Sequence, residues 1–110
     1  MPPGATVVGA RRKDALEAVA ADVRERYGVD ARAVACDLAD ESFGGALADA
    51  TRDLEIGLGV YNAAYSFIAP LLERPLDYAL TVVDVNVRGP IRFANALVPP
   101  MIARHRGGRV

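Results

Sequence analysis

The chain has one cysteine, one histidine and no apolar run long enough to cross a membrane. Cys36 has no second cysteine with which to form an internal disulfide or a multi-cysteine zinc site, and His105 has no second imidazole. The longest uncharged run, residues 56–72, is shorter than the roughly 18 residues of a membrane span and contains a proline. We therefore expect no metal centre, no disulfide scaffold and no membrane partner.

An excess of charge of either sign is also missing. The 13 basic and 14 acidic residues leave a net charge of −1, so no global field attracts nucleic acid or an anionic membrane. The first four residues, Met-Pro-Pro-Gly, lack the basic start and apolar run of a secretory signal, which leaves a cytoplasmic location as the expectation. With 110 residues, 52% of them hydrophobic, the chain has the size and composition of one globular domain.

The first half of the chain alternates between two kinds of apolar pattern. Residues 6–10 and 32–36 are short runs of mostly apolar residues, which predict buried strands. Apolar residues spaced by three and four predict a helix over residues 14–27, closed by Gly28, and a second helix over residues 43–54.

The second half continues this alternation. Residues 58–62 predict a third strand, residues 77–103 predict a helix interrupted at Pro90 and again at residues 99–100, and residues 109–110 look like the start of a further strand. The order β-α-β-α-β-α predicts an α/β fold with a parallel sheet covered by helices and right-handed crossovers. Ligands of such sheets bind beyond the carboxyl ends of the strands.

A proline stands four residues after an asparagine in the last predicted helix. Pro90 has no N–H, so the carbonyl of Asn86 loses its intrahelical partner. Two interpretations remain open from this pattern. Pro90 bends a long helix around a core and Asn86 satisfies the gap locally, or the freed carbonyl holds an ordered water that belongs to a proton path.

Four short motifs together resemble the middle of a classical short-chain dehydrogenase/reductase. They are Gly-Ala-Thr-Val-Val-Gly-Ala-Arg-Arg at 4–12, Cys-Asp-Leu at 36–38, Val-Tyr-Asn-Ala-Ala at 60–64 and Val-Asn-Val-Arg-Gly-Pro at 85–90. Each motif alone is weak, but their order and separation are specific and span essentially the whole chain. The resemblance implies a partial NAD(P)-binding domain over residues 1–110, with an incomplete doubly wound, Rossmann-like parallel sheet.

The resemblance also implies roles for single residues. Arg11 and Arg12 resemble the basic residues that hold the 2′-phosphate of NADP, although NAD stays possible, and a solvated pair at a helix start is the alternative. Asn86 matches the catalytic asparagine, whose backbone carbonyl holds the water that relays protons to the active-site lysine.

The remaining site residues follow the second and third predicted strands. Asp37 resembles the acid that accepts a hydrogen bond from the adenine amino group, and Leu38 resembles the residue that packs on the ring. An ordinary cap of the following helix is the alternative for Asp37. Asn62, Ala63 and Ala64 match the small-residue turn that lets the backbone approach the cofactor, with Ala64 in the place of a glycine.

The sequence departs from the family at both ends. Only residues 1–5 precede the first strand, which leaves no room for the family's first strand and its Thr-Gly-x-x-x-Gly-x-Gly turn. The family's Tyr-x-x-x-Lys pair is also missing, because the residues four positions after the tyrosines are Ala, Tyr, Ala and Val and Lys13 is the only lysine. We therefore expect an internal fragment of a longer enzyme, and we expect this chain alone to be inactive.

Two functional hypotheses follow from different classes. The parent would be a homo-oligomeric, NADP-preferring oxidoreductase that transfers hydride between nicotinamide and an alcohol or carbonyl substrate. Alternatively, the chain is a non-catalytic remnant or assembly module. A receiver-like domain would need clustered acids after its first strand and a late lysine, and the sequence has neither.

The missing first strand also predicts a change in strand pairing. In the family's strand order, that strand lies between residues 6–10 and residues 58–62. Leaving it out would expose two facing rows of unpaired backbone groups, which is costly. We therefore expect the gap to close, with the strand at Val7 pairing in parallel with the strand at Val60.

Overall fold

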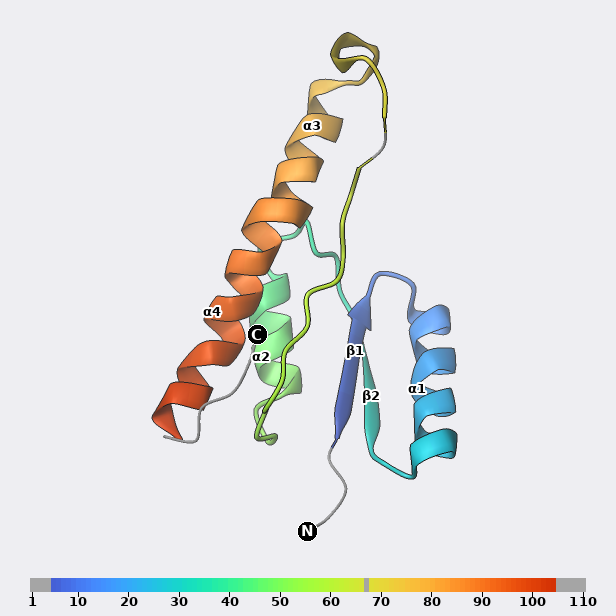
Figure 1. Ribbon diagram of the computed structural model, residues 1–110, viewed down its shortest axis with the longest axis vertical. Helices are drawn as coiled ribbons and strands as arrows, with labels where there is room; N and C mark the ends of the chain where they lie inside the picture. The colour runs from blue at the N-terminus through green and yellow to red at the C-terminus, as the bar shows by residue number, and fades with distance from the viewer. Residues whose placement is uncertain (1–4, 67, 105–110) are drawn as a thin grey trace.

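The computed structural model describes residues 5–66 and 68–104, and it shows an α/β arrangement followed by a long helical rod (Figure 1). The elements in chain order are β1 (Thr6–Ala10), α1 (Lys13–Tyr27), β2 (Ala31–Ala35), α2 (Phe43–Ala50), η1 (Leu71–Glu73), α3 (Leu76–Val83), η2 (Asp84–Arg88) and α4 (Gly89–Ala103). The start of a further strand expected at residues 109–110 lies outside the described residues.

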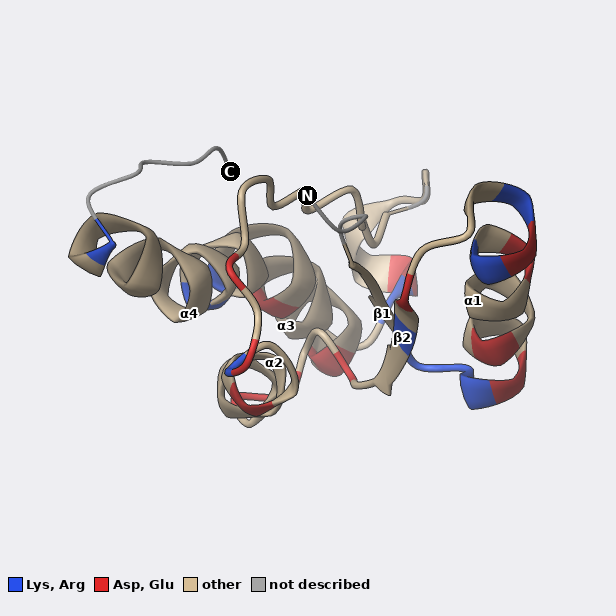
Figure 2. Cartoon of the chain, turned by 90° about the horizontal axis from the view of Figure 1, so that it is seen from below, with Lys and Arg blue, Asp and Glu red and all other residues tan. Residues whose placement is uncertain are grey.

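β1 and β2 form a parallel sheet whose register runs from Thr6 opposite Ala31 to Ala10 opposite Ala35. The pairing extends one step further, because the Cys36 N–H donates to the carbonyl of Ala10 at 2.8 Å. α1 connects the two strands and covers one side of the sheet, whereas α2 and α4 pack together on the other side (Figures 1 and 2). The predicted β-α-β unit is confirmed.

α1 packs on the sheet through a narrow apolar stripe and ends where the sequence predicts. Leu16 and Ala20 are buried, while the charged residues of the helix lie along its exposed surface (Figure 2). Gly28 follows the last helical residue with φ of 62°, and its N–H donates to the carbonyl of Arg24 at 3.0 Å. This left-handed conformation is the reason for a glycine at this position.

Replacing this glycine tests the cap directly. We expect Gly28→Ala to lower the free energy of unfolding by about 1 kcal/mol, because a side chain disfavours the left-handed conformation. A Cβ at Gly28 would meet no atom within 4 Å, so backbone strain is the only cost. Gly45→Ala, in the exposed middle of α2 and equally free of neighbours, is the matched control and should be neutral or stabilising in urea unfolding.

The predicted third strand is wrong. Among the described residues, only β1 and β2 form a sheet, and residues 58–62 do not form a ladder with β1. This segment packs on α4 instead. A Cβ at Gly59 would lie 3.1 Å from Leu97 and 3.2 Å from Phe93, and the Tyr61 ring meets the Phe93 ring edge-on at 5.6 Å between centroids. Packing on the helix therefore outweighs the satisfaction of the free edge of β1, and the predicted pairing of Val7 with Val60 does not occur.

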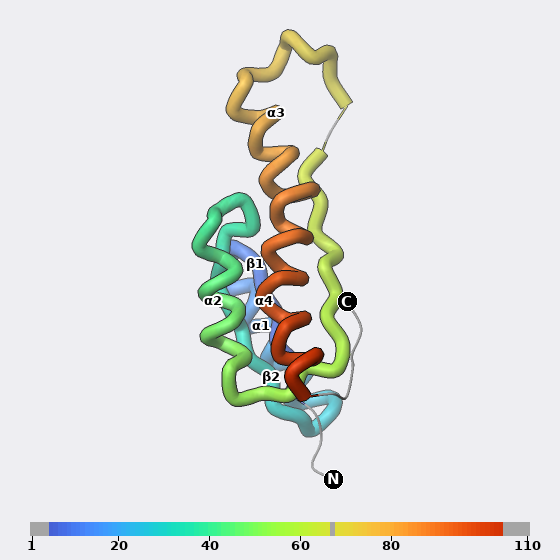
Figure 3. The backbone as a smooth tube through the Cα atoms, turned by 90° about the vertical axis from the view of Figure 1, so that its left-hand side faces the viewer, coloured from blue at the N-terminus to red at the C-terminus, as the bar shows by residue number. Residues whose placement is uncertain are grey.

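α3, η2 and α4 run without a break as one rod, and residues 58–66 lie alongside it (Figures 1 and 3). The interruption predicted at residues 99–100 is wrong. Pro99 and Pro100 lie inside α4, which is anchored on both sides of them by the buried Leu97 and Met101. None of the helices in the described part of the chain is long and apolar enough to span a membrane.

An arginine on β2 ties the sheet to the end of α2. Arg32 forms a fork to the Asp53 carboxylate, with nitrogen-to-oxygen distances of 2.7 and 2.9 Å, and also bonds Asp30 at 3.2 Å. The guanidinium holds the pKa of Asp53 below its usual value, mainly through these hydrogen bonds. Asp53 therefore contributes stability that is present above the carboxyl's unfolded pKa and lost as the pH falls through its lowered folded value.

Candidate functional site

The first candidate residues, Arg11 and Arg12, follow β1 at the carboxyl end of the sheet. Ala10 lies level with Ala35, so the residues that follow β1 and β2 emerge at the same edge. Arg11 and Arg12 are exposed there, and Arg12 is the N-cap of α1. Within the described parts of the chain, no ion pair involves either guanidinium. The arrangement leaves two cations available to a phosphate at this edge.

Asp37 follows β2 at the same edge and organises its own turn. Its Oδ1 accepts the Ala39 N–H at 3.0 Å, and its carbonyl accepts the Asp40 N–H at 3.0 Å. The carboxylate is exposed, so its other oxygen can accept a further donor, and Leu38 beside it is half-buried. Asp37 does not cap α2, which begins after Ser42 without a side-chain cap. The helix-cap alternative for Asp37 is therefore wrong in that form.

The small-residue turn lies between two anchored tyrosines. Asn62, Ala63 and Ala64 are exposed, whereas Tyr61 and Tyr65 on either side are half-buried against the rod. The thiol of Cys36, at the end of β2, contributes to a raised pKa of Tyr61 that is caused mainly by burial.

Asn86 is held in place by the backbone of that turn. Its Oδ1 accepts the Tyr65 N–H at 2.8 Å, and its Nδ2 donates to the Tyr65 carbonyl at 3.0 Å. Both polar ends of the side-chain amide are thereby engaged by one residue, 21 positions away in sequence. The side chain of Asn86 thus fixes the end of the turn at Tyr65.

The helix around Asn86 is a π turn rather than a simple kink. η2 is wound in the wider π register, and the Gly89 N–H donates to the carbonyl of Asp84, five residues earlier. Pro90 has no N–H to offer either Asn86, four residues earlier, or Val85, five residues earlier. The discontinuity lies where the sequence predicts it, although its form differs.

A tyrosine hydroxyl donates a hydrogen bond to one of these two carbonyls. Tyr61 Oη donates to the carbonyl of Val85 at 2.5 Å. A Cβ at Gly89 would lie 2.1 Å from the same oxygen, so only glycine lets the hydroxyl reach the helix. Neither Tyr61 nor Gly89, which stand in the motifs at 60–64 and 85–90, was predicted from the sequence to have a role of its own. The sequence carries no signal for this contact beyond the 24-residue separation of Tyr61 and Val85, which becomes informative once the segment and the rod are known to lie side by side.

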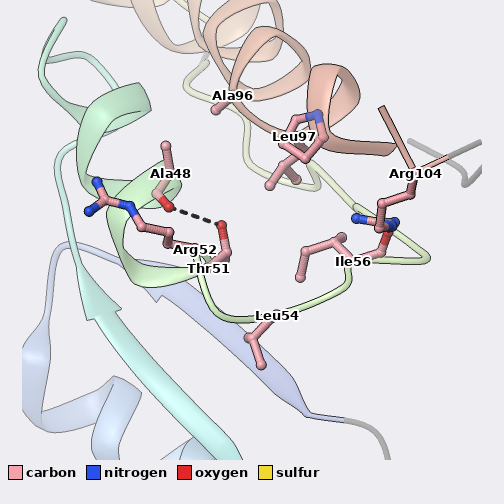
Figure 4. Close-up of a pocket in the computed structure, with 9 residues that line it drawn as sticks. Ala48, Thr51, Arg52, Leu54, Ile56, Ala96, Leu97 and Arg104 are labelled. Carbon is pink, nitrogen blue, oxygen red and sulfur yellow. Dashed lines mark hydrogen bonds between the residues drawn. The ribbon is translucent and has the colours of Figure 1, made fainter. Parts of the chain in front are cut away.

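Two hollows lie along the helical rod, one toward each end. The first, of about 250 Å³, lies between the ends of α2 and α4 at the opposite end of the sheet from Arg11 (Figure 4). Arg104 closes it by donating from Nη2 to the Ile56 carbonyl at 2.7 Å, and Thr51 turns its hydroxyl back to the carbonyl of Leu47 at 2.9 Å. The second is an apolar groove of about 470 Å³ around η1 and α3 that reaches Val82, one helical turn before Asn86.

The fold and this edge define an incomplete Rossmann-like domain, and comparison with known proteins agrees. A family model described as enoyl-(acyl carrier protein) reductase matches residues 2–110. The chain belongs to the short-chain dehydrogenase/reductase family.

Single relatives give the same result. The chain is 29% identical over 105 residues to the human very-long-chain 3-oxoacyl-CoA reductase, covering 92% of this chain and 34% of the relative. Among solved structures, it is similar to L-sorbose reductase from Gluconobacter frateurii in complex with NADPH and L-sorbose, with a TM-score of 0.84, 28% identity and coverage of 94% and 40%. It is also similar to an NAD⁺-bound xylitol dehydrogenase, with a TM-score of 0.81, 30% identity and coverage of 96% and 41%. The chain thus spans about a third of the curated relative's length.

Proposed function

We propose that this chain is the part of an NADP-preferring oxidoreductase that binds the adenosine end of the cofactor and supplies the relay asparagine. The observation that carries the proposal is the placement of two exposed guanidinium groups at the carboxyl end of β1, level with Asp37 after β2 and without an ion pair in the part of the chain that the structure describes. A 2′-phosphate suits this fork of cations, whereas a free ribose hydroxyl does not need it. Similar structures hold NADPH in one case and NAD⁺ in another, so the preference rests on Arg11 and Arg12.

The described residues fit one half of the cofactor. Asp37 has an exposed carboxylate for the adenine amino group, and Asn62, Ala63 and Ala64 present small side chains to a ligand crossing the edge. When bound, the cofactor would supply the hydride for interconversion of a small-molecule alcohol and its carbonyl. The chain's own contribution would be to orient the adenosine end and, at the main chain of Asn86, to hold a water in the proton path.

The second functional class is a non-catalytic module that retains the fold. It shares the sheet and the rod with the first hypothesis, but it makes no use of the two arginines. Binding at the edge of the sheet therefore separates the two hypotheses.

Titration of the chain with two nucleotides tests the proposal. We expect adenosine 2′,5′-bisphosphate to shift the backbone amide resonances of residues 11–12 and 36–38 in heteronuclear NMR spectra. Adenosine 5′-monophosphate should bind about ten times more weakly, because it lacks the 2′-phosphate that the guanidinium groups would hold. Equal affinities for the two nucleotides, or shifts confined to other regions, would favour the non-catalytic module.

A further inference from the structure

We propose that Tyr61 is the positioning residue of Asn86: its hydroxyl selects the π register of η2 and thereby decides where Asn86 points. Only the meaning of Asn86 for catalysis rests on the proposed function. The positioning itself is a property of the described contacts.

The Tyr61 hydroxyl and the Gly89 N–H compete for the carbonyl of Val85. In an α-helix the Gly89 N–H would donate to the carbonyl of Val85, four residues earlier. In the structure Tyr61 Oη donates to that carbonyl at 2.5 Å, and the Gly89 N–H goes to Asp84 instead. The hydroxyl therefore stands where the α-helical bond would form, and it keeps the turn in its wider register.

The ring of Tyr61 packs directly against the backbone of Gly89. Gly89 is buried, and its backbone approaches the phenol so closely that a Cβ would lie 2.1 Å from Oη and 2.9 Å from Cζ. The ring also packs edge-on against Phe93, with 5.6 Å between the centroids. Tyr61 is thus fixed by the part of the rod that follows the π turn.

The register of the π turn decides whether the side chain of Asn86 faces Tyr65. The segment before the small-residue turn is anchored on α4 through Gly59 and Tyr61, while Tyr65 at its other end is held by Asn86 within the π turn. An α turn holds one residue fewer per hydrogen-bonded loop than a π turn. Closing the π turn to an α turn would therefore rotate the side chains before it by about 100° about the helix axis, relative to α4. Asn86 could then no longer face Tyr65 while α4 keeps its contacts with Gly59. The segment from Gly59 to Tyr65 can keep its contacts with both α4 and Asn86 only when the turn is in the π register.

Pro90 removes the donor that would serve the carbonyl of Asn86 in an α-helix and the donor that would serve the carbonyl of Val85 in the π register. The Tyr61 hydroxyl donates to the Val85 carbonyl in place of that donor. It therefore satisfies the carbonyl that the π register would otherwise leave without a donor.

Tyr61→Phe tests the proposal in the 110-residue chain, because it removes only the hydroxyl. We expect the hydrogen-bond scalar coupling of the Gly89 amide nitrogen to move from the carbonyl carbon of Asp84 to that of Val85. We also expect hydrogen exchange of the Tyr65 N–H to accelerate about tenfold more than that of the amides of β2. Tyr27→Phe, whose ring is 68% exposed on α1, is the matched control and should leave both readouts unchanged.

Gly89→Ala provides a second, independent route to the same state. Its Cβ would displace the phenol, so it should accelerate exchange at Tyr65 as Tyr61→Phe does, and it should add little when both substitutions are combined. A Gly89–Asp84 coupling that persists in Tyr61→Phe, or exchange that accelerates evenly over the whole chain, would show that Tyr61 only stabilises the fold. Neither outcome depends on nucleotide binding, so the proposed function stands or falls separately.

Discussion

The 110-residue chain on its own is expected to oxidise no NADPH with any carbonyl substrate above the rate of buffer. A general acid in position typically contributes a factor of about 10² to 10⁴, and the family's acid is a tyrosine with a lysine four residues later. The chain has no such pair. Its single lysine, Lys13, begins α1 on the far side of the sheet from the rod.

The surroundings of three tyrosines near the small-residue turn support this expectation. The Tyr61 hydroxyl is committed to the Val85 carbonyl, and burial raises its pKa. A raised pKa keeps the phenol protonated, and the bond to a carbonyl directs its proton into the helix. The Tyr65 and Tyr78 rings pack against each other with 5.3 Å between centroids. Among the described residues, these three tyrosines are thus engaged in other contacts, which supports the expectation that the chain alone does not turn over.

Absorbance at 340 nm with a panel of aldehydes and ketones measures this directly. The positive control is a fusion in which a relative supplies the glycine-rich turn before residue 1 and the Tyr-x-x-x-Lys half after residue 110. Turnover by the fusion with none by the chain is the expected pattern. NADPH oxidation by the chain alone, dependent on substrate and abolished by heating, would contradict the assignment of the acid to a Tyr-x-x-x-Lys motif that these 110 residues do not contain.

Local patterns predicted the first half of the fold because their causes are local. The apolar stripe with Leu16 and Ala20, and the left-handed Gly28, determine α1 without reference to the rest of the chain. The third strand failed for the opposite reason. Residues 58–62 have the composition of a strand, but their environment is set by α4, and a ladder needs a neighbour that propensity cannot supply.

The two prolines of α4 give a related lesson. Pro99 and Pro100 carry a local penalty that predicts a break. The helix nevertheless continues, because Leu97 and Met101 are buried on the same helix before and after them. Tertiary packing overrides the local penalty here, and a single sequence does not contain that information.

Some features of the candidate site could be predicted from local sequence patterns, and others depend on tertiary packing. The strand ends could be predicted, because the order of elements places Arg11 and Asp37 at one edge and the structure has them there. Asn86 could be singled out from Pro90. The contacts of Asn86 with Tyr65 and of Tyr61 with Val85 could not, since they join residues 21 and 24 positions apart through side chains whose directions depend on the π turn.

The second large effect concerns the choice of nicotinamide cofactor. In the active fusion, we expect Arg11→Asp combined with Arg12→Ala to shift the preference from NADPH towards NADH by about 10²-fold or more. Each hydrogen bond to a charged group is worth roughly 1.5–3 kcal/mol, and a factor of ten corresponds to about 1.4 kcal/mol. The new carboxylate adds repulsion of the 2′-phosphate and an acceptor for the ribose hydroxyl of NADH.

The structure indicates that this double substitution would leave the fold intact. Both side chains are exposed, and Arg12 caps α1 through its main chain, without a side-chain bond. Arg26→Ala, on the exposed surface of α1 and paired only with Asp22 at 2.9 Å, removes a cation elsewhere and serves as the matched control. It should leave the cofactor ratio unchanged.

The ratio of kcat/KM for the two cofactors is the quantity to measure, because it cancels any general loss of activity. Salt provides a further check. The advantage of NADPH in the unsubstituted fusion should shrink as ionic strength rises, since the arginines are exposed and screened, and the double variant should lose most of this dependence. A cofactor ratio that is the same in the fusion and its double variant would remove Arg11 and Arg12 from the 2′-phosphate site and leave the edge of the sheet without a basis for NADP preference.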